Sequence, residues 1–220
     1  MDEETARTHL ISVVMPVFDG EKFLQLSLPA LIKMQERGEI IEVFVVDDGS
    51  HDRSARIAAD LGARIIRTEG RKGVAAARNL GVEYATGDII WFVDADVVVH
   101  EDAARIISNN FSNPEVTAVF GSYDDSPLEQ NFLSQYKNLV HHYYHQQGSR
   151  KASTFWAGCG AVRKESFQDV GGFDAEMYKL PGIEDIELGY RLRAAGYNIR
   201  LAPELQGQHL KLWHAWNLLH

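Results

Sequence analysis

The sequence predicts a single α/β domain in which helices flank a mainly parallel central sheet. Its first half alternates strand-like and helix-like segments, which is the pattern of βαβ units. Glycines or short polar turns separate these segments, so the connections are short. A length of 220 residues, of which 45% are hydrophobic and 24% charged, suits one domain with a sizeable core.

The elements of the first half follow from buried-type runs and from helical periodicity. Runs of β-branched and aromatic residues predict strands at 10–17, 40–46, 63–67 and 88–93. Helical periodicity predicts helices at 21–36, 52–61 and 74–84, the first two closed by Gly38 and Gly62. The strand at 88–93 is the most strongly marked, because Gly87 precedes the apolar run and two aspartates end it.

The second half is less regular, and it carries no internal repeat or low-complexity segment. Here we predict strands at 119–121, 157–162 and 198–201, and helices at 128–147 and 184–195. Gly196 ends the last of these helices, as glycine commonly does.

Composition excludes some partners and compartments. The formal charge is −9 and no run of Lys or Arg occurs, so a nucleic acid partner is not expected. A single cysteine, Cys159, forms no disulfide within the chain, which fits a reducing compartment. The acidic N-terminus does not resemble a signal peptide, and no apolar run reaches the ~18–20 residues of a membrane span. We therefore expect a cytoplasmic protein.

The segment 209–220 is apolar and carries two of the four tryptophans. It is predicted either to pack as a last helix or to begin an interfacial helix of a longer, membrane-associated protein. In the second case the protein would work at the inner face of a membrane.

Asp94 and Asp96 follow the strand at 88–93, at the sheet edge where α/β proteins bind ligands. Two carboxylates there suit Mg²⁺ or Mn²⁺, whose other positions go to water and phosphate oxygens. The alternative is a pair of solvated acids at a strand end.

Three further motifs suit a phosphate ligand. Pro16 ends ladder pairing in the first strand. Asp48 precedes a Gly-Ser turn, where it could bind a base or serve only in the turn. Gly73 opens a helix of small residues that also carries Arg78, whose positive charge suits a diphosphate.

Helical phase separates two adjacent acids at the start of the predicted helix 184–195. Asp185 shares a stripe with Leu188 and Leu192, so it is predicted to face inward as a candidate general base. Glu184 shares a polar stripe with Glu187 and is predicted to be solvated. The alternative role for Asp185 is to stabilise the first helical turn.

Histidines offer further ligands. His209, placed just beyond the last predicted strand, could complete a metal site of carboxylate and imidazole donors. His141, His142 and His145 lie on one predicted helix, and we interpret them as a solvent-exposed face of that helix near the mouth of a cavity.

Taken in order, these motifs resemble the inverting family-2 glycosyltransferases, which have the GT-A fold of nucleotide-diphospho-sugar transferases. The matching segments cover nearly the whole chain: Val14-Met-Pro-Val-Phe, Val46-Asp-Asp-Gly-Ser, Gly73-Val-Ala-Ala-Ala-Arg-Asn, Phe92-Val-Asp-Ala-Asp, Gly171-Gly-Phe-Asp and Glu184-Asp. The resemblance divides the chain into a polar tail (1–9), a GT-A domain (10–208) and the apolar segment (209–220). Within the domain, 10–97 would be the nucleotide-binding half and 98–208 the acceptor and catalytic half.

The resemblance also implies roles for individual residues. Asp185 would be the catalytic base, and Asp48 would bond the base of the nucleotide. The metal would be held by Asp96, His209 and Asp94, of which Asp94 could contact ribose instead. The nucleotide would lie against Pro16, Val17, Phe18, Gly73, Arg78 and Asp94. The donor-sugar and acceptor loop would comprise Trp156, Gly158, Gly160 and Glu184. The sequence Trp156-Ala-Gly-Cys-Gly departs from the Gly-Gly or Asn found in many members of this family, so the identity of the transferred sugar stays open.

The function implied is transfer of a sugar from a nucleoside diphosphate donor, UDP-linked, to an acceptor hydroxyl, with Mn²⁺ or Mg²⁺ as cofactor. The acceptor would be a lipid-linked molecule or a saccharide. Three alternatives stay open: a sugar-nucleotide-binding module without turnover, a nucleotidyltransferase and a phosphotransferase. Against the nucleotidyltransferase stands the missing Gly-rich loop after Met15, and against the phosphotransferase stands Val98 where that motif has Thr.

Overall fold

The four strands predicted in the first half form one side of a large sheet in the computed structural model, which describes residues 9–180 and 182–214. They are β1 (Ile11–Val17), β2 (Glu42–Asp47), β3 (Arg64–Arg67) and β4 (Ile89–Val93). All are parallel and lie in the order β3-β2-β1-β4. The predicted helices between them are also present: α1 (Glu21–Glu36), α2 (Ser54–Asp60) and α3 (Val74–Tyr84).

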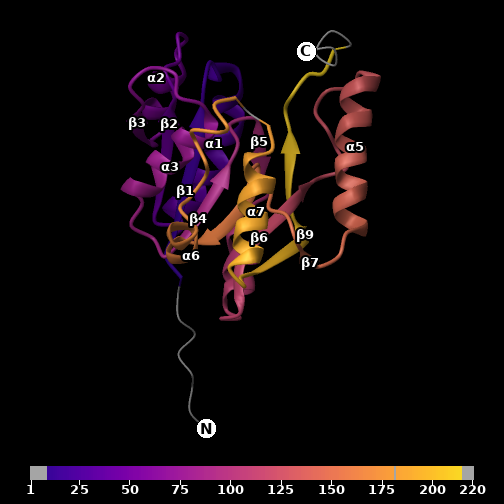
Figure 1. The fold of residues 1–220 in the computed structure, drawn as a ribbon. Coiled ribbons are helices and arrows are strands. Elements are labelled where there is room, and N and C mark those ends of the chain that lie inside the picture. Colours follow the sequence, from indigo (N-terminus) through magenta and orange to yellow (C-terminus); the bar gives the residue numbers. More distant parts are fainter. Residues whose placement is uncertain (1–8, 181, 215–220) are drawn as a thin grey trace.

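The second half completes a nine-stranded sheet. Its strands are β5 (Val97–Val99), β6 (Val116–Tyr123), β7 (Lys151–Ala152), β8 (Cys159–Arg163) and β9 (Asn198–His209). Its helices are α4 (Ala103–Phe111), α5 (Phe132–Gln147), α6 (Lys164–Asp169) and α7 (Glu184–Ala194). Because β8 runs antiparallel between β4 and β6, this half of the sheet is mixed. The predicted α/β class is confirmed, and helices cover both faces of the sheet (Figure 1).

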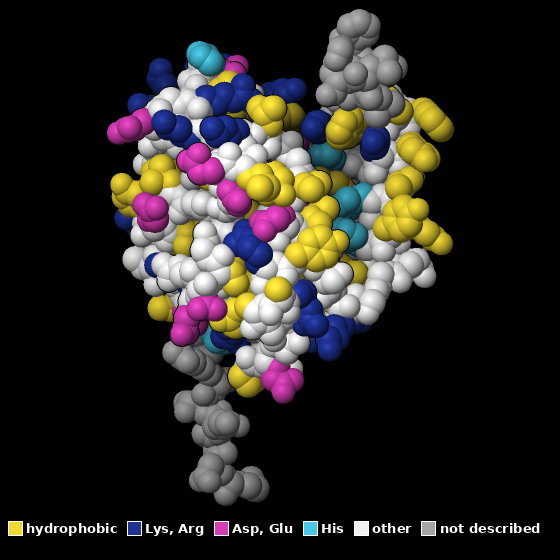
Figure 2. Space-filling model, viewed as in Figure 1, with side chains coloured by type: hydrophobic (Ala, Val, Ile, Leu, Met, Phe, Trp, Pro, Cys, Tyr) yellow, Lys and Arg dark blue, Asp and Glu magenta, His cyan; other side chains and the backbone are white. Residues whose placement is uncertain are grey.

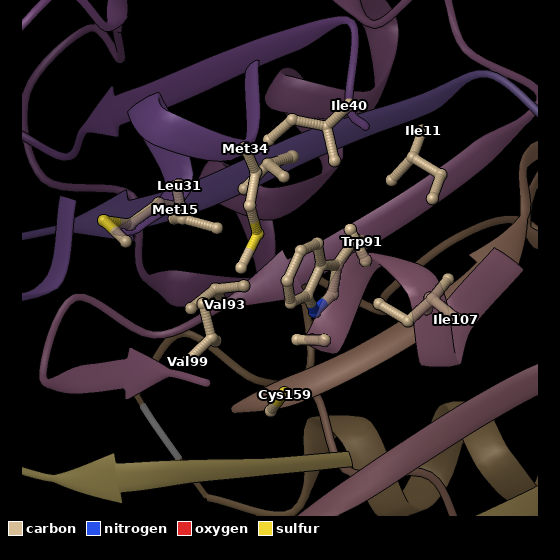
Figure 3. Packing of buried hydrophobic residues seen from close by; sticks show 14 of the residues in the cluster. Ile11, Met15, Leu31, Met34, Ile40, Trp91, Val93, Val99, Ile107 and Cys159 are labelled. Atoms are coloured by element: carbon tan, nitrogen blue, oxygen red, sulfur yellow. The ribbon is translucent and has the colours of Figure 1, made fainter. Parts of the chain in front are cut away.

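Two hydrophobic cores lie on opposite faces of the sheet, because successive strand residues point to opposite sides. On one face Val13 and Met15 pack with α1 and α4, and on the other Val14 packs with α3 and α7. Figure 3 shows the first core, where Met34 of α1 lies near Trp91 of β4. Burial on both faces explains why the central strands are nearly continuous apolar runs.

The sequence prediction missed β5, α4, β7 and α6, and it ended the last strand too early, at residue 201. That strand reaches His209, so His209 is its last residue rather than a residue beyond it. Pro203 lacks the backbone N–H that a ladder needs, and prolines within sheets are confined to edges, strand starts and bulges. In the structure Pro203 falls in a bulge: Leu201 pairs with Phe120, and the next pair is Gln206 with Ser122.

The described part of the apolar C-terminal segment is not a helix. Residues 210–214 have an irregular backbone, and Leu210 is buried. The backbone N–H of Trp213 donates to Ser134 Oγ of α5 at 2.8 Å, and the Lys137 ammonium lies 5.4 Å from the centre of the tryptophan ring. The rest of the predicted segment, 215–220, lies outside the described residues. Within 9–180 and 182–214, no helix is both long and apolar enough to cross a bilayer.

Candidate active site

A cavity of about 660 Å³ opens beyond the carboxyl ends of β1, β2 and β4. It extends from this edge to α5 and α7, and α5 stands beside β9 at the margin of the molecule (Figure 1). Most of the predicted site residues line it: Pro16, Val17, Phe18, Asp48, Gly73, Arg78, Asp94, Asp96, Trp156, Glu184 and Asp185. The predicted residues Gly158, Gly160 and His209 are buried and do not line the cavity.

Asp48 holds a loop at the β2 end of the cavity. Its Oδ1 accepts the backbone N–H of Lys72 and its Oδ2 that of Gly73, both at 2.8 Å, and the hydroxyl of Thr68 donates to Oδ1 at 2.9 Å. Gly73 has φ +98°, and a Cβ there would lie 2.3 Å from the carbonyl oxygen of Lys179, so only glycine fits. Asp48 therefore shapes this end of the cavity, and its predicted bond to a base would be an additional one.

Arg78 is the centre of a buried charge network. It is 3% exposed; its Nη2 donates to Asp94 Oδ1 at 2.7 Å and its Nη1 to Glu184 Oε1 at 2.9 Å. Burial opposes the charge of Arg78, but these two carboxylates outweigh it and raise the pKa of the guanidinium. Arg78 lines the cavity as predicted, although two of its nitrogens are occupied by carboxylates.

The prediction that Glu184 is solvated was wrong. Glu184 is 5% exposed, because Arg78, distant in sequence, pairs with it inside the domain. Its second oxygen accepts the N–H of Gly182 at 2.8 Å. Both oxygens of Glu184 are therefore occupied, and the residue anchors the segment that precedes α7.

Asp185 faces the cavity, half-buried at the start of α7. Its Oδ2 accepts the N–H of Ala157 at 3.1 Å and its Oδ1 that of Ile186 at 2.8 Å. Burial raises the pKa of Asp185, and the nearby charge of Arg78 offsets only part of that rise. A carboxylate that is held in place and more basic than usual suits a general base.

Of the three predicted metal ligands, Asp96 and His209 lie close together, whereas Asp94 has another partner. His209 Nε2 lies 3.4 Å from Asp96 Oδ2, and His209 Nδ1 lies 2.7 Å from Asn138 Oδ1. The amide oxygen can only accept, so Nδ1 carries the proton and the Nε2 lone pair points towards Asp96. Asp94 instead bonds Arg78. Among the described residues no three His, Cys, Asp or Glu side chains form a metal cluster.

Asp96 and His209 therefore fit a divalent cation that takes its remaining ligands from water and a diphosphate. Because Nε2 carries no proton, it and Asp96 Oδ2 are two lone-pair donors 3.4 Å apart, an arrangement that a cation bound by both would stabilise.

Positions 158 and 160 require glycine, because Trp156 lies against both of them. A Cβ at 158 would come within 2.5 Å of the Trp156 ring, and a Cβ at 160 within 2.3 Å of the Trp156 carbonyl oxygen. The two glycines thus leave room for Trp156, and it is Trp156 that lines the cavity.

Several lining residues escaped the sequence prediction. Phe120 and Phe155 lie in apolar stretches that carry no motif. His141 and His145 were predicted to lie on a solvent-exposed helical face near a cavity mouth; they do line the cavity, but they are half-buried and their rings pack near Trp156. Figure 2 shows histidine side chains gathered in the hollow between α5 and the rest of the domain. Their i, i+4 spacing was the available signal, but nothing in the sequence places Trp156 opposite them.

Known proteins resemble this chain in sequence and in fold. The family model described as "Glycosyl transferase family 2" matches residues 12–171, and one described as "N-terminal domain of galactosyltransferase" matches residues 137–215. The pre-mycofactocin glycosyltransferase of Mycobacterium tuberculosis is 29% identical over 204 residues, which cover 88% of this chain and 41% of that protein. The chain spans half or less of the length of the first curated relatives it matches.

Two solved structures share the fold, which is GT-A. One is a mannosyltransferase from Pyrobaculum calidifontis in complex with GDP-Man and Mn²⁺, with a TM-score of 0.71 and 21% identity, covering 96% of this chain and 59% of that one. The other is S. aureus TarS 1-349 in complex with UDP-GlcNAc, with a TM-score of 0.68 and 18% identity, covering 93% of this chain and 59% of that one.

Proposed function

The chain belongs to glycosyl transferase family 2, and from that premise we propose that it moves a sugar from a nucleoside diphosphate donor to an acceptor hydroxyl with inversion. The observation that carries the proposal is Asp185, a half-buried carboxylate of raised pKa on the wall of the cavity that Pro16 and Asp48 also line. A base and a nucleotide-sized space in one cavity suit a single displacement.

The reaction transfers the sugar to the acceptor oxygen and the acceptor's proton to the enzyme. The acceptor oxygen attacks the anomeric carbon from the face opposite the diphosphate, and Asp185 takes the hydroxyl proton. The bond between the anomeric carbon and the β-phosphate oxygen breaks, and its electron pair stays on the departing diphosphate. Glu184 does not compete for the proton, because Arg78 and Gly182 occupy its oxygens.

Asp96 and His209 are the side chains that would hold a divalent cation. When bound, such a cation neutralises negative charge on the diphosphate, which makes the nucleotide a better leaving group. We propose Mn²⁺ or Mg²⁺, since the pair of donors and the diphosphate oxygens suit either. The P. calidifontis relative, in complex with Mn²⁺, supports this proposal.

The proposed donor is a UDP-sugar. Phe18 offers an aromatic wall for the nucleoside, and the guanidinium of Arg71 lies 3.9 Å from the centre of that ring. Relatives of the same fold carry UDP-GlcNAc in one case and GDP-Man in another, so both nucleotides belong in the test.

A turnover assay tests the proposal directly. The chain is incubated with UDP- and GDP-sugars, with manganese or with EDTA, and release of the nucleoside diphosphate is measured with a panel of acceptors and with water alone. We expect release from one nucleotide series. Tight binding of a sugar nucleotide without any release would favour a binding module, and release of pyrophosphate or phosphate would indicate a nucleotidyl- or phosphotransferase.

UDP should bind more tightly with manganese than with EDTA, and Asp96→Ala should abolish that difference. The reason is that Asp96 is the carboxylate of the proposed cation pair, and changes even in outer-shell partners cost ~10–100-fold in metal affinity. Titration calorimetry of UDP with and without manganese measures this. Asp60→Ala, at an exposed position, is the matched control. An undiminished manganese effect in Asp96→Ala would show that Asp96 is not a ligand.

A further inference from the structure

The α5 end of the cavity contains a histidine nitrogen without a partner. The His141 ring centre lies 4.3 Å from that of Tyr123 and 4.7 Å from that of Trp156. Its Nδ1 is buried and has no hydrogen-bond partner among the described residues. His141 lines the cavity, and since its Nδ1 is buried, Nε2 is the nitrogen that is left to bind a ligand.

The two histidines of this end take complementary roles. Unpaired buried N–H groups are rarer than unpaired acceptors, so the His141 proton belongs on Nε2, which becomes a donor towards the cavity. His145 Nδ1 lies 2.8 Å from the Gly121 carbonyl oxygen, so Nδ1 is protonated and Nε2 is an acceptor. One helical turn of α5 thus offers a donor and an acceptor side by side, with ring centres 4.0 Å apart.

Trp156 adds an aromatic surface next to the proposed base. Its ring rests on Gly158, and the residue that follows it, Ala157, donates its N–H to Asp185. A ligand lying on Trp156 is therefore held close to the carboxylate that would take its proton.

The two histidines of this end are neutral, and the charged groups beside them, Asp185 and Asp96, are carboxylates. Burial, reinforced by the neighbouring histidines, lowers the pKa of His141 to about 3, and burial also lowers the pKa of His145. The cationic side chains among the described lining residues are Arg71, Arg78 and Lys179. Arg71 lies over Phe18, Arg78 pairs with two carboxylates, and the backbone of Lys179 lies against Gly73. None of these belongs to α5 or to the Trp156 loop, where a phosphate would need a positive charge.

We propose that this end is the acceptor subsite and that it binds a neutral sugar ring, which stacks on Trp156 while His141 donates to its hydroxyls and His145 accepts from them. A hydroxyl group both donates and accepts, so it matches the histidine pair, whereas a phosphate only accepts. The inference rests on the proposed function and narrows its acceptor from any hydroxyl compound to a saccharide.

The test measures acceptor binding rather than turnover. Saturation-transfer NMR is recorded on the whole chain with UDP and manganese, using p-nitrophenyl glycosides of glucose, galactose, mannose and N-acetylglucosamine in both anomers. Farnesyl phosphate serves as the lipid phosphate probe. We expect at least one glycoside to bind the wild-type chain and farnesyl phosphate not to compete with it.

His141→Phe keeps the ring packing and removes both nitrogens. Glycoside affinity should fall about three- to tenfold, as expected for one neutral hydrogen bond, while UDP affinity stays the same. The melting temperature should not fall, because the variant also removes a buried nitrogen that has no partner among the described residues. His141→Gln, which keeps an N–H at that reach, should retain most of the affinity. His214→Phe, the same change at an exposed site, is the control.

The outcomes separate the two proposals. Unchanged glycoside affinity in His141→Phe, competition by farnesyl phosphate, or binding of UDP without any glycoside would each overturn the saccharide subsite and leave the transferase proposal standing. Failure of every sugar nucleotide and of UDP to bind would overturn the proposed function and this inference with it.

Discussion

Asp185→Asn should lower the transfer rate by about 10²–10⁴-fold, the usual contribution of a positioned general base. The amide keeps the shape of the carboxylate and can still accept the N–H of Ala157, but it cannot take a proton. Nucleotide affinity should be unchanged, because the residues proposed to hold the nucleotide lie at the ends of β1, β2 and β4 and at or near the start of α3, whereas Asp185 lies on α7. A loss confined to the rate would identify Asp185 as the base.

The pH profile supplies a second measurement for Asp185. The carboxylate must be ionised to accept a proton, and burial raises its pKa above the 3.8 of an ordinary aspartate. The wild-type rate should therefore fall with decreasing pH at a value higher than 3.8, and the residual rate of Asp185→Asn should lack this limb. Asp125→Asn, at an exposed position, serves as control. Near-native turnover in Asp185→Asn would refute the assignment and the strongest reason for an inverting mechanism.

The parallel half of the fold was predictable because its signals are local. β4 is an apolar run closed by Asp94, and α1 ends where a glycine follows. β5 was missed because three valines form a strand only through pairing with β9, which lies far along the chain. α4 is different: Ala103, Ala104, Ile107 and Phe111 are buried at helical spacing, so the pattern was present in the sequence and was overlooked.

The candidate site could be predicted where a motif lies at the end of a strand or the start of a helix. It could not be predicted where a residue depends on contacts with residues distant in the sequence. Asp94, Asp96 and Asp185 were found from their places at a strand tip and a helix start. Helical phase correctly placed Asp185 at the cavity, but it failed for Glu184, because the method assumes that a carboxylate beside polar neighbours is solvated. Only the tertiary structure brings in Arg78, whose charge makes burial of Glu184 favourable. For the same reason the sequence placed His141 near a cavity mouth but could not show that its ring packs near Trp156.

Arg78→Met should destabilise the domain by about 3–5 kcal/mol, the cost of removing one partner from a buried ion pair. The change leaves the carboxylates of Glu184 and Asp94 without their cation, and Glu184 is too buried for water to replace it. For a chain of this length the melting temperature should fall by roughly 6–20 °C. Urea and thermal denaturation measure the loss. Arg56→Met, which breaks a pair exposed on both sides, should cost less than about 1 kcal/mol.

A double variant distinguishes the stability lost through an uncompensated buried charge from the stability lost through packing. Arg78→Met/Glu184→Gln removes the uncompensated carboxylate along with the cation, so it should recover much of the stability that Arg78→Met loses. The amide oxygen that replaces the carboxylate in this variant can still accept the N–H of Gly182, which keeps the start of α7 in place beside Asp185. If the double variant were as unstable as Arg78→Met, the guanidinium would act mainly through its packing against Phe173. If Arg78→Met were no less stable than Arg56→Met, the ion pairs of Arg78 with Asp94 and Glu184 would not stabilise the domain.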